Sequence, residues 1–187
     1  MKSNRQISRQ VGLIYNWLDE HLNNSDAKGN CAACGNCCDF EKFGHKLFVT
    51  TPEIMYFKCS VEKLNCHSDR SDAKRCAAEE SIKTDSSTSL RPARAGLRCA
   101  RNDKFGRCCY QVDGKCTVYP YRFAGCRIFS CKGNADFQSD LTEAVIKKFK
   151  ALCEKYRIPY RYVELPVALK DFLTTEGTKI HRDNIEF

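Results

Sequence analysis

The sequence contains no run of about 18 apolar residues, so we expect no helix that spans a membrane. Its first residues lack an apolar segment followed by a cleavage site of small residues, which argues against an export signal and favours a reducing, cytoplasmic compartment. Apolar residues are also scarce, at 42% with the cysteines and about 35% without them. A chain of 187 residues is long enough for a single domain, 1–187, but we expect metal or cross-links to help stabilise it.

Catalytic patterns are missing as well. The four histidines stand in no recognisable catalytic context, and no nucleophile–base pair is evident, so hydrolytic or thiol catalysis is disfavoured. The net charge of +8 counts every cysteine as neutral. Eight thiolates that hold two divalent ions would reduce this charge to about +4, so it is weak support for nucleic-acid binding. Whether the protein catalyses any reaction stays open.

Hydrophobic periodicity predicts a mainly α fold with long irregular loops. Apolar residues at helical spacing predict amphipathic helices at 5–23 and 140–156, the second within a packing segment at 138–157. Thr51 and Pro52 are typical of a helix start, where Glu53 would favour the helix dipole. Further expected elements are a turn at Asp113-Gly114, a strand at 161–166, a helical turn at 167–173 and a short helix near 74–82. The polar stretch at about 60–98 is typical of an insertion.

Cysteine is the abundant residue, with 14 in the chain. In a reducing compartment, clustered cysteines bind metal more often than they form disulfides. The first block is Cys31-Ala-Ala-Cys34-Gly-Asn-Cys37-Cys38, whose two-residue gaps let thiolates turn toward one point and whose Gly35 permits a tight backbone. A second block supplies Cys108, Cys109, Cys116, Cys126 and Cys131. Neither block closes a site alone, so we expect metal to staple the two together across residues 31–131.

Two separated motifs resemble the YkgJ-like cysteine-cluster family, whose CxxCxxCC domain is associated with zinc or iron chelation. They are CAACGNCC followed by TPEI, and CYQVDGKCTVYPYRFAGCRIFSC. The matching positions are Cys31, Cys34, Cys37, Cys38, Cys109, Cys116, Tyr119, Arg122, Cys126 and Arg127. Phe123 stands where the family usually has proline, which places the local turn in question. The resemblance implies metal binding without naming a reaction.

The cysteines divide into an expected ligand set and a weaker group. The expected metal ligands are Cys31, Cys34, Cys37, Cys38, Cys109, Cys116, Cys126 and Cys131. Cys59, Cys66, Cys76 and Cys99 lie in or near the insertion and could form a further site, although their spacing is irregular. Cys153 lies on the apolar side of the second long helix and is expected to be core.

The identity of the metal depends on the donor set. The triple CxxCxxC and the lack of histidine within either block favour an iron–sulfur cluster, and we expect [4Fe–4S]. Such a cluster predicts a redox, electron-transfer or metal-handling role. Its redox or protein partner is not identified by the sequence. The alternative is zinc in closed sites of a structural module that binds nucleic acid or a protein. His45 and His67 are the histidines nearest the cysteines, and we expect them to be solvated rather than ligands.

Basic residues lie beside the second cysteine block. Arg122 and Arg127 flank Cys126; they either offset the charge of a thiolate site, receive an acidic partner or substrate, or form internal salt bridges. The segment 91–107 carries six basic residues against one aspartate, which makes nucleic-acid binding conceivable but not favoured.

Overall fold

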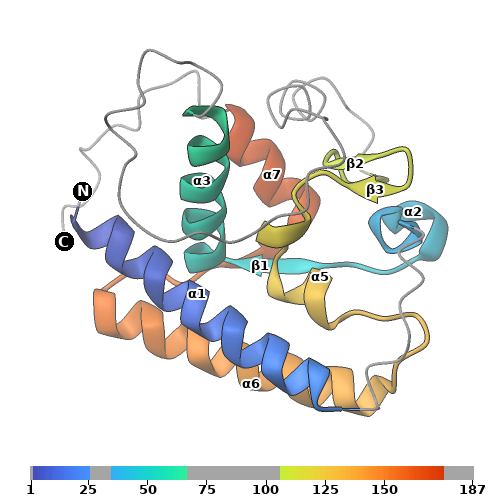
Figure 1. Ribbon diagram of the computed structural model, residues 1–187, viewed down its shortest axis with the longest axis horizontal. Helices are drawn as coiled ribbons and strands as arrows, with labels where there is room; N and C mark the ends of the chain where they lie inside the picture. The colour runs from blue at the N-terminus through green and yellow to red at the C-terminus, as the bar shows by residue number, and fades with distance from the viewer. Residues whose placement is uncertain (1, 26–34, 67–105, 175–187) are drawn as a thin grey trace.

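The computed structural model describes residues 2–25, 35–66 and 106–174, and most of these residues are helical (Figure 1). Its elements in chain order are α1 (Lys2–Asn23), η2 (Asn36–Cys38), α2 (Phe40–Phe43), β1 (Phe48–Thr50), α3 (Thr51–Cys66), β2 (Gln111–Val112), β3 (Lys115–Cys116), η3 (Tyr119–Tyr121), α5 (Ala124–Ile128), α6 (Ala135–Tyr156), β4 (Tyr162–Glu164) and α7 (Leu165–Thr174). The prediction of a mainly α fold is confirmed, with two small two-stranded sheets in addition. No helix in this part of the chain is both long and apolar enough to cross a membrane.

The long helices α1 and α6 run side by side in opposite directions, and α5 packs against both (Figure 1). Both long helices were predicted, but α1 begins at Lys2 rather than at 5, and α6 begins at Ala135 rather than at 140. The start of α6 is set by Asn134, whose side chain accepts a 2.8 Å hydrogen bond from the Phe137 N–H and caps the helix. The core between these helices consists of Ile7, Val11, Tyr15, Leu18, Leu22, Ala124, Ile128, Leu141, Val145, Phe149 and Leu152.

A second core lies around the sheet of β1 and β4. The two strands are antiparallel, with Phe48 opposite Glu164 and Thr50 opposite Tyr162, so segments more than a hundred residues apart meet here. The strand predicted at 161–166 and the helical turn predicted at 167–173 are present as β4 and α7. The buried residues of this core are Phe40, Leu47, Val49, Phe57, Val61, Tyr110, Val118, Phe123, Leu165, Ala168 and Leu169.

The hairpin β2–β3 has the predicted two-residue turn. Asp113 (φ 49°) and Gly114 (φ 76°) are both in the left-handed region, which matches the twist of a tight hairpin. The expected insertion at 60–98 lies mostly outside the described residues, as does the helix expected near 74–82. Its first part is not irregular, because α3 continues to Cys66. Phe57 and Val61 are four residues apart and buried, so the helix has an apolar face to extend.

A buried carboxylate connects four segments of the fold. Glu53, in the first turn of α3, is 2% exposed. Its Oε1 accepts hydrogen bonds from the Tyr15 hydroxyl (3.1 Å) and the Ala124 N–H (2.7 Å). Its Oε2 accepts hydrogen bonds from the N–H (2.9 Å) and the hydroxyl (2.8 Å) of Thr50. The side chain expected only to favour the helix dipole therefore joins α1, β1, α3 and the first residue of α5.

Burial and hydrogen bonding act in opposite directions on this carboxylate. Burial raises the pKa of Glu53 above its ordinary value of 4.5, although the four donors favour the charged form. Because the pKa is higher in the folded state, the contribution of Glu53 to stability is complete below pH 4.5 and is lost as the pH rises through the folded-state value.

We expect Glu53→Ala to lower the free energy of unfolding by about 3 kcal/mol or more, because it leaves four donors without their acceptor. Glu143→Ala, at an exposed position of α6, is the matched control and should change stability by less than about 0.5 kcal/mol. Urea denaturation of the purified proteins measures both values. Equal stability of the two variants would contradict the role given to Glu53.

The pH dependence provides a separate prediction. Above pH 4.5, the stability of the wild type should fall relative to that of Glu53→Gln, by up to about 1.4 kcal/mol per pH unit, because only the wild type releases this proton on unfolding. Denaturation curves recorded from pH 4.5 to 8 measure the difference, and parallel pH profiles would show that Glu53 titrates normally.

Candidate metal centre

Backbone contacts hold the two cysteine blocks together. The Cys108 N–H donates a 2.7 Å hydrogen bond to the Cys38 carbonyl, and the Glu41 N–H donates one of 3.1 Å to the Gly106 carbonyl. Asp39 and Arg107 form an isolated antiparallel β-bridge between the same two segments, and their side chains form an ion pair of 2.7 Å. Residues about 70 positions apart are therefore in register beside η2.

Gly35 lies against the turn of the β2–β3 hairpin. Its φ is 72°, and a Cβ added at this position would lie only 2.3 Å from the Gly114 carbonyl oxygen. Glycine was expected here for a tight backbone, and the structure adds a second reason, which is the close approach of the second block. Any larger residue would push the two blocks apart.

Five thiols from the two blocks lie close enough for their charges to interact. They are Cys37, Cys38, Cys108, Cys116 and Cys126. The Cys38 thiol and the Cys37 sulfur share a hydrogen bond, which lowers the pKa of Cys37 and raises that of Cys38. Adjacent cysteines rarely direct both side chains to one point, but the 3-10 turn η2 brings these two sulfurs into contact.

Burial controls the other three thiols. It raises the pKa of Cys108 to about 12 and also raises those of Cys116 and Cys126, because a thiolate is poorly solvated there. These thiols are therefore protonated at neutral pH when no cation is near. A soft metal ion would replace the protons and supply the charge that the buried thiolates lack.

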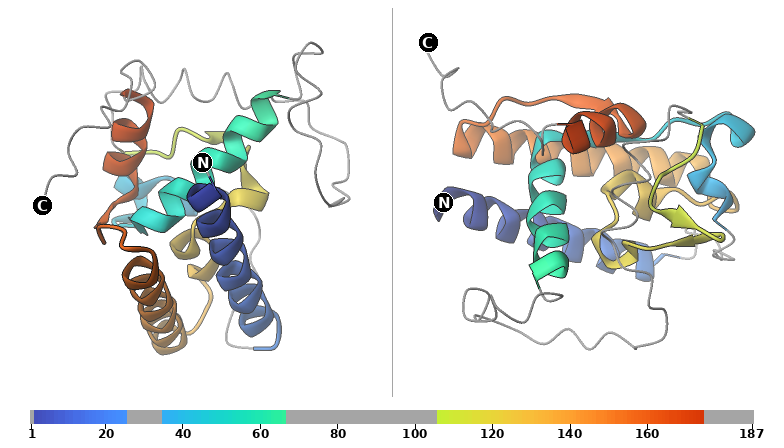
Figure 2. Two further views of the ribbon diagram at one scale, coloured as in Figure 1. Left: turned by 90° about the vertical axis from the view of Figure 1, so that its left-hand side faces the viewer. Right: turned by 90° about the horizontal axis from the view of Figure 1, so that it is seen from above.

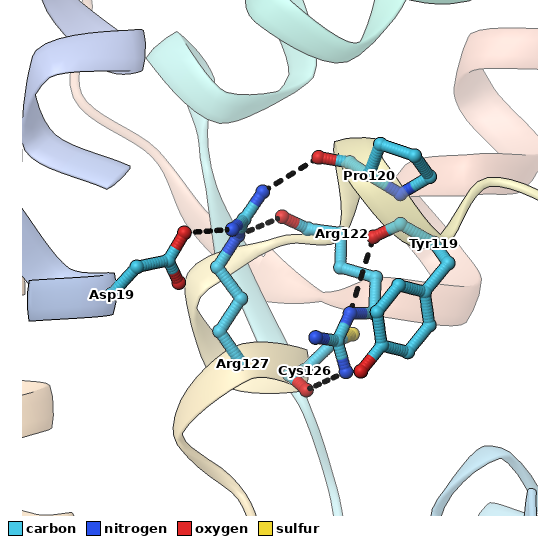
Figure 3. A network of polar contacts seen from close by, with 6 residues as sticks. All are labelled: Asp19, Tyr119, Pro120, Arg122, Cys126 and Arg127. Atoms are coloured by element: carbon cyan, nitrogen blue, oxygen red, sulfur yellow. Dashed lines mark hydrogen bonds and ion pairs between the residues drawn. The ribbon is translucent and has the colours of Figure 1, made fainter. Parts of the chain in front are cut away.

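Arg122 is the cation that faces the thiols. Its guanidinium lies 3.6 Å from the centre of the Tyr119 ring, and Nη1 donates to the Cys126 carbonyl at 3.3 Å (Figure 3). Burial raises the pKa of Cys116 and Cys126, and the charge of Arg122 opposes that rise in both. Among the roles considered for this arginine, the structure favours the electrostatic one, in which its charge offsets that of the thiolates.

Arg127 forms an internal salt bridge instead. Its Nη1 forms a 2.7 Å ion pair with Asp19 of α1, while Nη2 and Nε donate to the carbonyls of Pro120 and Arg122, each at 2.8 Å (Figure 3). The side chain is only 9% exposed, and its guanidinium also lies 4.4 Å from the centre of the Tyr15 ring. Arg127 is a structural cross-link between η3, α5 and α1.

His45 lies beside the cluster, between two phenylalanine rings. Its ring stacks on Phe129 with centroids 4.5 Å apart and meets Phe40 edge-on at 5.6 Å. Nε2 is 2.9 Å from the Cys37 carbonyl oxygen, and Nδ1 is buried with no hydrogen-bond partner among the described residues. His45 is half-buried rather than fully solvated, and His67 lies outside the described residues.

The structure brings together only part of the expected ligand set. Cys37, Cys116 and Cys126 are in the cluster with Cys38, whereas Cys31 and Cys34 lie outside the described residues. Cys109 is disulfide-bonded, so it is not a thiolate in this structure. Cys131 is an exposed free thiol in the loop before α6. Cys108 was absent from the predicted set, although its place beside Cys109 repeats the Cys37–Cys38 pair and could have indicated it.

The weaker group of cysteines is not assembled in the described part of the chain. Cys59 is a half-buried free thiol on α3, and Cys66 is the last residue of that helix. Cys76 and Cys99 lie outside the described residues. Cys153 is buried in α6, which confirms its expected place in the core.

Within residues 35–66 and 106–174, no group of three or more histidine, cysteine, aspartate or glutamate side chains is arranged to hold a metal ion. Two expected ligands, Cys31 and Cys34, lie outside these ranges. No protein-family model, no curated protein and no solved structure matches the chain. The resemblance to the YkgJ-like family therefore stays a prediction.

The two arginines should respond differently to substitution. Arg127→Gln should lower the free energy of unfolding by about 2 kcal/mol, because a charged donor is lost to three partners. Arg122→Gln should leave stability nearly unchanged and slow the alkylation of Cys37 at pH 7 by about twofold or more, since the charge that favours its thiolate is gone. Urea denaturation and mass spectrometry of the reduced, metal-free protein measure both effects. An equal loss of stability and an equal change in alkylation rate in both variants would contradict the different roles given to the two arginines.

Proposed function

We propose that this protein binds metal through cysteine thiolates, as an iron–sulfur protein with a redox, electron-transfer or metal-handling role. The observation that supports it is the cluster of Cys37, Cys38, Cys108, Cys116 and Cys126, five thiols from blocks about 70 residues apart. All five are half-buried; Cys108, Cys116 and Cys126 pack against the second core, and the charge of Arg122 acts on Cys37, Cys116 and Cys126. Thiolates are the ligands that iron–sulfur clusters and zinc prefer in proteins.

The residues present fit such a group in their chemistry. The sulfur donors lie at a partly buried site. An iron–sulfur cluster would supply one-electron transfer, whereas zinc would supply only cross-linking. The protein's own part is to hold the sulfurs together through η2 and the β2–β3 hairpin and to offset their charge with Arg122. Metal bound here would staple the two blocks of a small cysteine-rich domain.

The remaining parts of the proposal follow from this chemistry. Membership of the YkgJ-like family is supported by the motifs at Cys31–Cys38 and Cys109–Cys131. A reducing, cytoplasmic compartment would keep the eight described free thiols available. Cys109 would have to be reduced before it could act as a ligand. Zinc is the alternative metal, and a structural module that binds a protein or nucleic acid is the alternative role.

The direct test is anaerobic purification followed by iron, zinc and acid-labile sulfide analysis and a visible spectrum. Iron with equal sulfide supports a cluster, stoichiometric zinc supports the structural alternative, and protein without metal after reconstitution excludes both. Cys126→Ser should lose most of the metal, whereas Cys153→Ala, which removes a core thiol outside the cluster, should keep it. Full metal content in Cys126→Ser would remove that assignment, and full content in Cys131→Ser would remove Cys131 from the ligand set.

A second candidate function is nucleic-acid binding, and the surface that favours it is not the one expected. Of the segment 91–107, only its last two residues are described, and Arg107 is paired with Asp39. The end of α6 and the chain after it, residues 144–161, carry six basic residues and one glutamate. Lys148 lies 4.2 Å from the Trp17 ring centre, and Lys155 lies 5.7 Å from that of Tyr156. Cations beside aromatic rings are typical of surfaces that bind single strands.

We expect the metal-loaded protein to bind a labelled single-stranded RNA with an affinity that falls steeply as salt increases. The double substitution Lys148→Glu and Lys155→Glu should weaken binding by about tenfold or more, whereas Lys132→Glu, in the loop before α6, should change it by less than about twofold. Fluorescence anisotropy at salt concentrations from about 20 to about 300 mM, a range of about one decade, measures the affinity and its dependence on salt. No binding at low salt would exclude this function.

A further inference from the structure

The main chains of the two cysteine blocks meet at a pair of cysteines. The Cys108 N–H donates a 2.7 Å hydrogen bond to the Cys38 carbonyl oxygen, and both residues carry half-buried free thiols. The neighbouring residues of these segments, Asp39 and Arg107, form an antiparallel β-bridge and an ion pair. Cys38 and Cys108 therefore lie opposite one another, although they are far apart in the sequence.

This hydrogen bond limits the distance between the two Cα atoms. A Cα atom lies about 1.5 Å from its own nitrogen and about 2.4 Å from its own carbonyl oxygen. With 2.7 Å between the nitrogen and the oxygen, the Cα atoms of Cys38 and Cys108 are at most about 6.6 Å apart. Disulfides span Cα separations of about 4.4–6.8 Å. The main chain therefore already holds these two cysteines within the reach of a disulfide.

The thiols of this pair also interact. The hydrogen bond with Cys37 and burial are the main causes of the raised pKa of Cys38, and among nearby charges that of Cys108 adds most to the rise. Cys37 contacts Cys38 as well, but the Cα atoms of consecutive residues are about 3.8 Å apart, which is below the usual range for a disulfide. Cys108 is therefore the better partner for Cys38.

The second block already contains an oxidised cysteine. Cys109, the residue after Cys108, is disulfide-bonded in this structure. In a reducing compartment, disulfides are usually transient and respond to the redox state. Oxidation at these blocks would therefore compete with metal for the same sulfurs, because a sulfur in a disulfide is no longer a thiolate ligand.

We infer that oxidation of the metal-free protein joins Cys38 to Cys108 in a disulfide, and that this bond keeps both sulfurs from binding metal. The formation of the bond is independent of the proposed function, whereas its effect on metal rests on it. A small disulfide such as oxidised glutathione is the oxidant. One cysteine thiolate attacks it and releases one small thiol, and the other cysteine attacks the resulting mixed disulfide and releases the second. The protein thiols lose two electrons and two protons, and the two released thiols receive them.

Mass spectrometry of the full-length chain, reduced, freed of metal and then incubated with oxidised glutathione, tests the bond. The remaining thiols are alkylated, and fragmentation of the cross-linked peptides identifies the joined cysteines. We expect a link between Cys38 and Cys108 that dithiothreitol removes and that persists in Cys37→Ser and Cys131→Ser.

Zinc binding by the reduced and the oxidised chain tests the effect on metal. The oxidised chain should bind zinc more weakly by about tenfold or more, because two ligands are withheld. Cys109→Ser, which removes the neighbouring thiol, is the matched control and should keep this difference. In Cys108→Ser, oxidation should no longer change zinc binding through this pair, and the difference should shrink to less than about twofold.

The outcomes separate this inference from the proposed function. Alkylation of both Cys38 and Cys108 while the exposed Cys131 carries glutathione would overturn the inference, and so would a main link between another pair of cysteines. Equal zinc binding by the reduced and the linked chain would overturn the effect on metal. A reduced chain that takes up neither zinc nor iron overturns the proposed function and that effect with it, whereas the fragment spectra decide the disulfide on their own.

Discussion

The hydrogen-bonded carboxylate of Glu53 is the interaction on which the arrangement of this fold depends. It is fully enclosed, and its four donors come from α1, from the residue before α3 and from the first residue of α5. A carboxylate in such a place is stable only while every donor is present, because a partly satisfied buried group costs more than it contributes. The two cores meet at α3, which carries Phe57 of the second core and packs Met55 and Tyr56 against the first. Figure 2 shows α3 running across α1.

The same point sets the position of the cysteine cluster. Glu53 accepts from Ala124, and Cys126 follows two residues later in α5. Arg127 then fixes the other end of this short helix to α1 and η3. On the far side of the cluster, the hydrogen bond from Cys108 to the Cys38 carbonyl keeps the blocks in register. Backbone and core contacts thus bring thiols of the two blocks near one another.

The environment of the thiols explains what kind of ion could bind. Burial disfavours the thiolates of Cys108, Cys116 and Cys126, and Arg122 offsets part of that cost for Cys116 and Cys126. A divalent ion or a cationic cluster would offset the rest. His45, which lies against the Phe40 and Phe129 rings, has Nε2 2.9 Å from the Cys37 carbonyl oxygen at the edge of the cluster. The chemistry of the site is therefore decided by residues from both blocks and by the aromatic side chains around them.

The sequence by itself determined the helices, because their signals are local. The apolar stripes of α1 and α6, the Asp113–Gly114 turn and the short strand β4 all depend on residues a few positions apart. It also indicated Cys37, Cys116 and Cys126 by their spacing. Only the tertiary structure decided that Cys108 joins them, that Cys131 stays exposed and that Arg122 and Arg127 have different roles. It decided the burial of Glu53 as well, because this burial depends on contacts with α1 and α5, 38 and 71 residues away along the chain, which no local pattern encodes.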